Sequence, residues 1–550
     1  DITFDNNKFI YLNLVMASSL YRFMLCIVIL VTFHYHQMKP ISVPQDQNYC
    51  YITACDVLSK IQEKLPLFFD NQSAKYASST ASSNDEDYEM NGIHFKDTQE
   101  TRLIKLERRL RSVEQTVWLK SDKDDSWYRC CEGPCRCRPE IHTLSCWKQD
   151  MEELPFDQII PADIRVIDLG INQLSTLSKD AFTGLYKLTE LDLFDNRLDF
   201  LPATIFHNLE SLIHLKLRKN HLSELPGKLF ISTINLSTMD LSQNLIKTLP
   251  SSFFKGAIRL TVVQLSYNAI ESLPFNVFHD LVSLEELDLS QNILTSVQYG
   301  TFSGMYSLKR LKLQSNRINQ LPVGIFDDLK YLDFLSLRNN RLSFIRPGLF
   351  NSFKHLTFLE LSENWISSLN GDEFSHLTSL KELHLGQNYI ETIPPGSFSN
   401  LQSLEKLFLY SNNIQELHAG TFAGLHNLTA LFLNNNLLRY LDTKAFEPMV
   451  HLKKLQLDSN KLQYLATDSL SLLPNLITLK LAKNPWHCDC AILYMARWLR
   501  ANRRKVWDSK PTCRGPGNLG GKSVEDMSFD DLCEGQWASM VKLTARVPIK

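Results

Sequence analysis

The chain repeats one pattern of apolar and polar positions every 24 residues, as the step from Asn196 to Asn220 illustrates. Apolar residues lie eight, five and three places before each asparagine and, except after the last asparagine, two and five places after it. Around Asn196 these residues are Leu188, Leu191, Leu193, Leu198 and Leu201. The asparagines of the series are Asn172, Asn196, Asn220, Asn244, Asn268, Asn292, Asn316, Asn340, Asn364, Asn388, Asn412, Asn436, Asn460 and Asn484.

A phenylalanine column accompanies the first thirteen asparagines, ten places after each of them, and Leu470 alone replaces phenylalanine in that column. The column consists of Phe182, Phe206, Phe230, Phe254, Phe278, Phe302, Phe326, Phe350, Phe374, Phe398, Phe422 and Phe446. Columns that stay in register over so many repeats indicate one stacked architecture. We expect the phenylalanines to stack on the outer side of that stack.

The alternation of apolar and polar residues before each asparagine predicts one short strand per repeat, paired in parallel with the next. A single coil cannot bury its own leucines, so neighbouring coils must stack into a solenoid with a continuous core. An asparagine amide both donates and accepts hydrogen bonds, which suits a buried turn after each strand. Each of the fourteen repeats contributes one strand to the same side of the solenoid. Because strands pack more closely than the bulkier segments on the other side, we expect the array to curve, with the strands forming a concave sheet.

The repeat "LxxLxLxxNxLxxLPxxxFxxL" resembles the leucine-rich repeat of extracellular proteins over roughly residues 130 to 535. The resemblance implies an α/β solenoid, a leucine-rich repeat horseshoe with a parallel concave β-sheet and disulfide caps at both ends. Similar proteins include the acid-labile subunit of the insulin-like growth factor complex, the carboxypeptidase N non-catalytic subunit, chaoptin, Slit and Toll-type ectodomains. They share a rigid curved scaffold that binds another protein without chemistry of its own.

The composition shifts predict six segments. We expect a leader and signal peptide at 1–37, a linker with a short amphipathic or coiled-coil helix (about 100–120) at 38–129, an amino-terminal cap at 130–161, repeats at 162–484, a carboxy-terminal cap at 485–534 and a tail at 535–550. The apolar run "FMLCIVILVTF" at 23–33 favours a secretory signal, since a spanning helix needs about 20 residues. A short membrane anchor is the alternative.

The cysteines cluster at both ends of a long cysteine-free stretch, which indicates disulfide-stapled caps in a secreted chain. The family resemblance implies the pairs Cys131–Cys137, Cys135–Cys146, Cys488–Cys513 and Cys490–Cys533. Zinc at "HCDC" (487–490) is the alternative, which the flanking repeats disfavour. Cys50 and Cys55 can pair, and one of Cys130 and Cys131 is left over for a bridge to another chain or a free or differently paired thiol.

The helix predicted before the amino-terminal cap places its apolar residues at alternating spacings of three and four. They are Leu103, Leu106, Leu110, Val113 and Val117. This is a two-heptad seam, which predicts either a short coiled coil between chains or a single amphipathic helix laid on the cap. A homo-oligomer formed through this helix or through the spare cysteine is therefore possible.

Composition and motifs limit the classes of partner and the kinds of catalytic or metal site that the sequence supports. With 44% hydrophobic residues and a formal charge of −2, the balance suggests neither disorder nor a polyanion-binding protein, and we expect no nucleic-acid partner. The sequence contains no nucleophile motif, phosphate loop or metal-spaced cluster. We therefore predict a protein that is not an enzyme and has no cofactor and no metal site.

The outward positions of each strand lie six, four and two places before the asparagine, and most of them are polar. Two groups on adjacent strands differ because they contain exposed aromatic residues, in one case beside an arginine. Such groups are typical of protein interfaces. The candidate ligand-binding residues are Phe334, Arg338, Phe358, Glu360, Phe408, Tyr410 and Phe432. A glycosaminoglycan site is a weaker alternative, because acids interrupt the basic residues Lys216, Arg218, Lys219, Arg310 and Lys312.

Three N-glycosylation sequons begin at Asn71, Asn235 and Asn427. Asn235 and Asn427 each lie nine places before the asparagine of their repeat, so they occupy the same angular position on the predicted solenoid. Glycans there would leave the concave sheet clear.

These features together predict a secreted, non-catalytic scaffold that holds an extracellular protein ligand or partner subunit on its concave face. The alternative is the truncated ectodomain of a membrane receptor or cell-adhesion protein of Toll-like or neuronal type. An enzyme with a leucine-rich front end would need a catalytic domain beyond Lys550. No apolar segment of spanning length follows Cys533 in this sequence, which favours the secreted form.

Overall fold

The structure is a computed structural model that describes residues 99–115, 117–507 and 509–533. The chain divides into two compact units, Asp1–Phe95 and Lys96–Lys550, and all described residues belong to the second unit. The predicted signal segment, Cys26, Cys50, Cys55 and the sequon at Asn71 lie outside the described residues.

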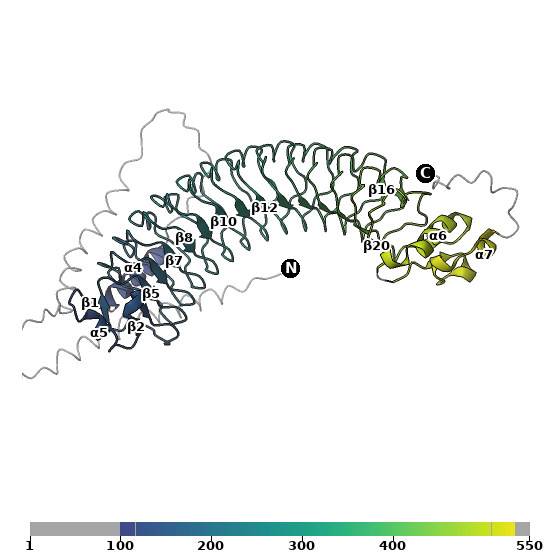
Figure 1. Ribbon diagram of the computed structural model, residues 1–550. Coiled ribbons are helices and arrows are strands. Elements are labelled where there is room, and N and C mark those ends of the chain that lie inside the picture. The colour runs from purple at the N-terminus through teal and green to yellow at the C-terminus, as the bar shows by residue number, and fades with distance from the viewer. Residues whose placement is uncertain (1–98, 116, 508, 534–550) are drawn as a thin grey trace, which may run out of the picture. The chain divides into compact units, whose positions relative to one another are not determined.

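One sheet of sixteen strands runs the length of the second unit, on the inner side of its curve (Figure 1). All neighbours pair in parallel except β2 and β3, which are antiparallel. In order, the strands are β2 (Arg136–Arg138), β3 (Thr143–Ser145), β5 (Val166–Asp168), β6 (Glu190–Asp192), β7 (His214–Lys216), β8 (Thr238–Asp240), β9 (Val262–Gln264), β10 (Glu286–Asp288), β11 (Arg310–Lys312), β12 (Phe334–Ser336), β13 (Phe358–Glu360), β14 (Glu382–His384), β15 (Lys406–Phe408), β17 (Ala430–Phe432), β19 (Lys454–Gln456) and β20 (Thr478–Lys480).

The solenoid and its parallel concave sheet are confirmed, and the sheet has two more strands than the repeats predict. Fourteen strands, β5 to β20 without β16 and β18, belong to the repeats, and β2 and β3 come from the amino-terminal cap. The cap hairpin therefore continues the sheet past the first repeat and covers the first repeat strand's edge, which would otherwise be open to pairing.

The remaining elements lie at the two ends or on the outer side. Among the described residues, no helix is both long and apolar enough to cross a bilayer. The helices are α4 (Gln99–Glu114), α5 (Ser126–Cys130), α6 (Leu493–Ala501) and α7 (Phe529–Cys533), and the short paired strands are β1 (Leu119–Ser121) with β4 (Ile159–Pro161), β16 (Glu416–Leu417) with β18 (Tyr440–Leu441), and β21 (Trp486–His487) with β22 (Cys513–Gly515).

The repeated asparagines form a continuous hydrogen-bonded ladder. In the coil of Asn316, Oδ1 accepts the backbone N–H of Leu294 at 3.0 Å, while Nδ2 donates to the carbonyls of Leu289 and Leu313, both at 3.0 Å. Each amide thus joins its own turn to the preceding coil. All fourteen asparagines are buried except Asn268, which is partly exposed. The expected role of the amide, to donate and accept in a buried turn, is confirmed, and the amide also donates to a third carbonyl, that of Gln314 at 3.5 Å in this coil.

The residue before each asparagine has a left-handed backbone conformation, with φ of 53° to 59°, and none of these residues is glycine. For an L-residue this conformation costs about 1 kcal/mol. The cost recurs in every coil because the chain must turn inward sharply enough for the asparagine amide to reach the backbone of the preceding coil. The asparagine hydrogen bonds and the stacked neighbours hold the backbone in this state.

The phenylalanine column is a buried spine on the outer side, as expected. Phe278 and Phe302 are stacked with ring centroids 6.2 Å apart, and Phe302 and Phe326 follow at 6.1 Å. Trp118, buried before the first repeat, closes the amino end of the spine by an edge contact with Phe182 at 6.1 Å. The leucines and this spine together form one hydrophobic cluster from cap to cap.

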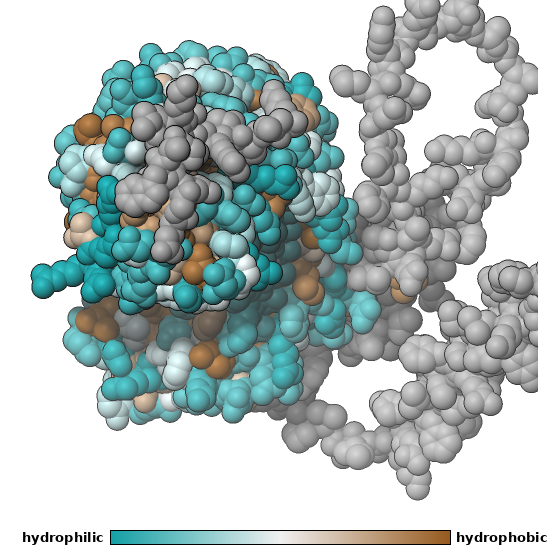
Figure 2. Space-filling model, turned by 90° about the vertical axis from the view of Figure 1, so that its right-hand side faces the viewer, coloured by the Kyte–Doolittle hydropathy of each residue, from teal (hydrophilic) through white to brown (hydrophobic). Residues whose placement is uncertain are grey.

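Each end of the core is covered by a disulfide-linked cap. In the amino-terminal cap the buried Gln158 accepts the N–H of Cys135 and donates to the carbonyl of Cys130, which fastens the loop to α5. In the carboxy-terminal cap, Trp486 of β21 is fully buried, and its indole N–H donates to the carbonyl of Leu481 at 3.1 Å. Seen from this end, the surface is mostly hydrophilic with separate hydrophobic residues (Figure 2). The disulfides are Cys130–Cys137, Cys135–Cys146, Cys488–Cys513 and Cys490–Cys533.

The expected bond between Cys131 and Cys137 is wrong, because Cys137 is bonded to Cys130. Ser126 and Cys130 lie four residues apart on α5, so they share the helix face that packs against β4, and both are buried. Cys131 follows at the next position around the helix axis and is exposed. Among the described cysteines it is the one outside a disulfide.

Cys131 should be the described cysteine that reacts with iodoacetamide in the folded, unreduced protein, since alkylation requires an accessible thiol. Peptide mapping after alkylation and non-reducing digestion measures this. Carbamidomethylated Cys131 together with an intact Cys130–Cys137 peptide is the expected result. A label on Cys130 would instead support the Cys131–Cys137 pairing.

Candidate functional site

The concave face is formed by the side chains that alternate with the buried leucines of each strand. In β12, for example, Phe334 and Ser336 flank the fully buried Leu335. Each strand therefore contributes its first and third residues to this face, and the residue two places before each asparagine lies at its margin. The seven candidate ligand-binding residues all occupy these positions.

Two predicted aromatic groups are parts of one continuous stack, which we call the ring row: Phe334, Phe358, His384, Phe408 and Phe432. Phe334 and Phe358 are stacked at 4.7 Å, and Phe408 and Phe432 at 4.5 Å. His384 joins the two pairs, 4.9 Å from Phe358 and 4.0 Å from Phe408. All five rings are half-buried on consecutive strands of the sheet.

A cation lies over each end of the ring row. The Arg310 guanidinium is 4.5 Å from the centroid of Phe334, and the Lys454 ammonium is 5.0 Å from that of Phe432. Cation–aromatic contacts of this kind stabilise by about 0.5–1 kcal/mol at exposed sites. They hold the terminal rings in a defined orientation, so the ring row is a preorganised surface.

His384 is held between two carboxylates. Its Nδ1 lies 3.3 Å from Oε2 of Glu360, and its Nε2 lies 3.4 Å from Oε2 of Glu382. Burial raises the pKa of Glu382, but the hydrogen bonds from Lys406 and His384 outweigh burial and hold that pKa below its usual value. The two glutamates therefore orient the imidazole ring that connects the two phenylalanine pairs.

Arg338 and Tyr410 border the ring row without stacking on it. Arg338 donates to Oε1 of Glu363 from Nη2 at 2.6 Å, and this hydrogen bond raises the pKa of the guanidinium. Tyr410 lies flat against the backbone of Gly386, since a Cβ added there would be 2.6 Å from two ring carbons. Both side chains form a polar margin around the rings.

Sequence reasoning named four of the five rings and missed His384 and Lys454, and it named Arg310 only as part of the glycosaminoglycan alternative. His384 lies four places before Asn388, in the same column as Phe408, so the column reading could have found it. The register of the stack could not be read in advance, because it shifts from the first strand position at Phe358 to the third at His384.

The charged residues of the first repeats neutralise one another. Lys216 lies 2.7 Å from Glu190 and 3.2 Å from Asp192, and Lys312 lies within ion-pair distance of Glu286 and Asp288. Acidic residues at these positions also accept backbone N–H groups, as Asp288 does from Ser290 at 2.9 Å. This part of the face is a polar surface of paired charges, which argues against the glycosaminoglycan interpretation.

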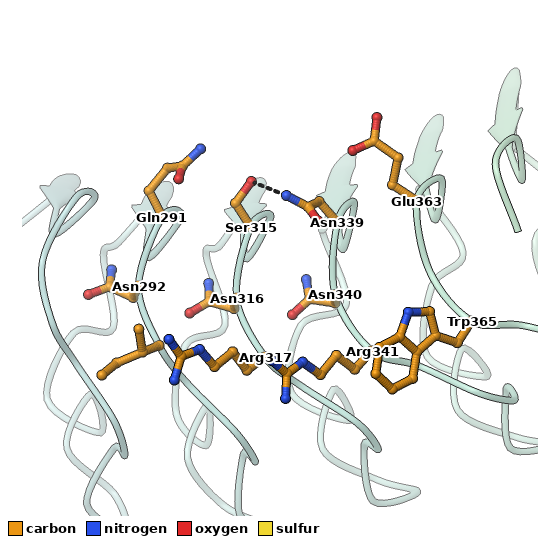
Figure 3. A pocket seen from close by; sticks show the side chains of 11 residues that line it. Gln291, Asn292, Ser315, Asn316, Arg317, Asn339, Asn340, Arg341, Glu363 and Trp365 are labelled. Carbon is orange, nitrogen blue, oxygen red and sulfur yellow. Dashed lines mark hydrogen bonds between the residues drawn. The ribbon is translucent and has the colours of Figure 1, made fainter.

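A second feature is an open depression of about 380 Å³ on the margin of the array, below the ends of four strands (Figure 3). The side chains of Arg317 and Arg341 follow one another in a row along the array, and the Arg341 guanidinium is 5.8 Å from the indole of Trp365. Asn316 and Asn340, which line the depression, are committed to the asparagine ladder. The lining outside the ladder has two guanidiniums beside an indole, with Gln291, Ser315, Asn339 and Glu363 also lining the depression.

The sequons at Asn235 and Asn427 occupy matching places on the edge of the array. Nδ2 of Asn235 donates to the carbonyl of Glu210 at 2.7 Å, and Nδ2 of Asn427 donates to that of Gln402 at 2.8 Å. Asn475, at the equivalent place, makes the same bond although it begins no sequon. The bond is thus a structural feature of this position, and it uses one of the two amide hydrogens.

Residues 99–115, 117–507 and 509–533 contain no group of three or more histidine, cysteine, aspartate or glutamate side chains that could hold a metal ion. Cys488 and Cys490 of "HCDC" are both in disulfides.

A family model described as "Leucine rich repeat" matches seven overlapping or adjoining stretches that run through all the repeats. The matched residues are 162–198, 187–233, 234–294, 283–342, 331–390, 378–438 and 427–485. This match covers more than half of the chain.

Two curated relatives match short stretches. Carboxypeptidase N subunit 2 of Mus musculus is 35% identical over 57 residues, which is 10% of this chain and 10% of the relative. SLIT and NTRK-like protein 5 of Homo sapiens is 35% identical over 74 residues, 14% of this chain and 8% of the relative. The chain thus spans about a tenth of the length of each relative.

Two solved structures resemble the fold. A leucine-rich repeat protein of Leptospira interrogans has a TM-score of 0.53 and 27% identity, covering 71% of this chain and 99% of that one. The Drosophila Toll–Spätzle complex in its glycosylated form has a TM-score of 0.50 and 21% identity, covering 68% of this chain and 65% of that one. The second likeness concerns the fold alone.

Proposed function

Because the chain belongs to the leucine-rich repeat family, we propose that it is a non-catalytic scaffold that holds an extracellular protein ligand or partner subunit on its concave face. The ring row carries this proposal. Four phenylalanine rings and the His384 imidazole, with a cation over each end, form an aromatic centre on a face that is otherwise mostly polar.

The size and character of the ring row favour a protein over a small molecule. Five consecutive strands at about 4.8 Å spacing give the row a length of about 20 Å. A surface of that length with a central group of aromatic rings and a charged margin matches the arrangement of protein–protein interfaces. The margin here consists of Arg338, Glu360, Glu382 and Lys406. In the name of the mouse relative, a related chain is described as a subunit of a larger assembly.

An extracellular setting is supported by the caps. Four disulfides close the two ends of the solenoid, and structural disulfides persist in oxidising compartments. We include N-glycans on Asn235 and Asn427 in the proposal, since each amide keeps one hydrogen that the ladder-like bond does not use. Both positions lie away from the concave strands, so glycans there leave the ring row open.

Position-specific photocrosslinking tests the proposal. A photoreactive benzoylphenylalanine at Gln456, on concave strand β19, should crosslink the folded chain to a different protein in the extracellular fluid or cell-surface fraction of the source tissue. The matched control places the same group at Glu447, an exposed residue of the outer turn in the neighbouring repeat. Mass spectrometry identifies the crosslinked protein.

An adduct formed from position 456 and absent from position 447 supports a concave-face protein ligand. Equal crosslinking from both positions, or adducts from 447 alone, would reject the concave face as the binding surface. Conversion of a small substrate by the purified chain would reject the non-catalytic assignment.

A further inference from the structure

Helix α4 contacts the repeats with its polar side. Arg111 donates from Nη2 to Oδ2 of Asp199 at 3.1 Å, and the Arg108 guanidinium lies 3.9 Å from the same oxygen. Ser112, on the same side, is 6% exposed. The ion pairs with Asp199 therefore fix which side of the helix faces its own chain.

The apolar side of α4 faces away from the repeats. Leu103, Leu106, Leu110 and Val113 are 68%, 60%, 54% and 70% exposed. A single amphipathic helix on a globular body buries its apolar stripe, which is the reverse of this arrangement. Contiguous exposed apolar residues of this kind mark an interaction surface.

We propose that a second copy of this chain covers this surface, with the two α4 helices packed in parallel and in register. The spacing of three and four residues places Leu103 and Leu110 at heptad position a and Leu106 and Val113 at d. Such a seam is self-complementary, so it suits a twofold dimer in which each helix presents the same residues.

The charges beside the seam select the parallel orientation. Arg109 falls at position g and Glu114 at the following position e, and both are exposed. In a parallel pair, Arg109 faces Glu114 of the partner subunit, and twofold symmetry forms this contact twice. In an antiparallel pair, position g faces g, so Arg109 would meet Arg109 of the partner subunit and repel it.

A groove beside α4 extends the apolar surface onto the repeats. It has a volume of about 560 Å³ and is lined in part by Val113, Phe200, Leu225 and Pro226. Two heptads alone form a marginal coiled coil. The groove lets the incoming helix contact the repeats as well as α4, which adds the buried area that the short seam lacks.

Dimerisation through α4 goes beyond the proposed binding function. It gives one assembly two ring rows, so a ligand with two copies of its binding site would be held by avidity rather than by a new contact. Each ring row remains intact in a monomer, so the two proposals can fail separately.

Sedimentation equilibrium of the full chain under mild native reduction tests the dimer, after peptide mapping shows that the four intramolecular disulfides remain intact. Reduction excludes a Cys131 bridge as the cause of association. The wild type should be a monomer–dimer mixture at tens of micromolar, and Leu110→Glu should weaken the dimer about tenfold or more, since it places two carboxylates in the seam. Ile258→Glu, at another exposed apolar residue, is the matched control and should leave the dimer unchanged.

Charge exchange tests the orientation. Arg109→Glu and Glu114→Arg should each weaken the dimer, and the double variant should restore it. A wild-type monomer at every concentration, or a dimer that Leu110→Glu leaves intact, would overturn the proposal. A dimer that the double exchange does not restore would overturn the parallel register. Circular dichroism of each variant establishes that the solenoid is still folded.

Discussion

Replacing Asn316 with alanine should lower the free energy of unfolding by about 3 kcal/mol, because it leaves buried backbone groups without partners. The substitution removes the acceptor of the Leu294 N–H and the donor to the carbonyls of Leu289 and Leu313. Two adjacent coils lose these side-chain hydrogen bonds at once, while the backbone pairing of β10 with β11 remains. Urea unfolding followed by circular dichroism measures the change.

The matched control is Arg317→Ala, one residue further along the same coil. Arg317 is exposed and lies outside the asparagine ladder, so its loss should change the unfolding free energy by less than about 0.5 kcal/mol. If the free energy of unfolding fell by the same small amount in both variants, the structural role of the ladder would be contradicted. Because repeat arrays unfold in blocks, we expect the Asn316 variant to show an added early transition.

The double substitution Phe408→Ala and Phe432→Ala should weaken binding of the protein ligand identified by crosslinking about 100-fold. The two rings form the closest phenylalanine pair of the ring row, and a loss of about 1.4 kcal/mol for each truncated aromatic contact amounts to about 100-fold for the pair. Biolayer interferometry with the purified ligand measures the dissociation constant. Both rings lie on the surface of the sheet, so the hydrophobic core stays intact.

Two controls separate loss of the surface from loss of the fold. Tyr306→Ala removes an exposed aromatic away from the strands and should leave affinity unchanged. Tyr410→Ala should have a smaller effect than the double variant, because Tyr410 lies against Gly386 outside the stack. If the double variant kept wild-type affinity and wild-type thermal stability, the ring row would not be the binding site.

The sequence predicts the architecture well because the fold is a sum of identical contacts. The asparagine column, the leucines and the phenylalanine spine each appear in the structure at the places that the 24-residue period assigns. The period runs from Asn172 to Asn484, so a residue wrongly assigned in one repeat does not change the assignment of the other repeats.

Three features could not be read from the period, because each depends on how one side chain is turned. Cys130 and Cys131 are neighbours in sequence, and only the face of α5 that packs on β4 decides which one pairs with Cys137. The period places His384 on the concave face, but its stacking between the two phenylalanine pairs depends on its contacts with Glu360 and Glu382. The outward orientation of the α4 seam depends on Asp199, which lies 88 residues beyond Arg111.

At the left-handed residue before each asparagine, the backbone geometry does not depend on which side chain is present. These fourteen positions hold isoleucine, aspartate, lysine, glutamine, tyrosine, serine, asparagine and glutamate, all with nearly the same φ. The neighbouring amide enforces the turn whatever side chain the position carries. The side chains along this edge of the solenoid can therefore be replaced one coil at a time, in evolution or in a display library, without changing the curvature of the solenoid.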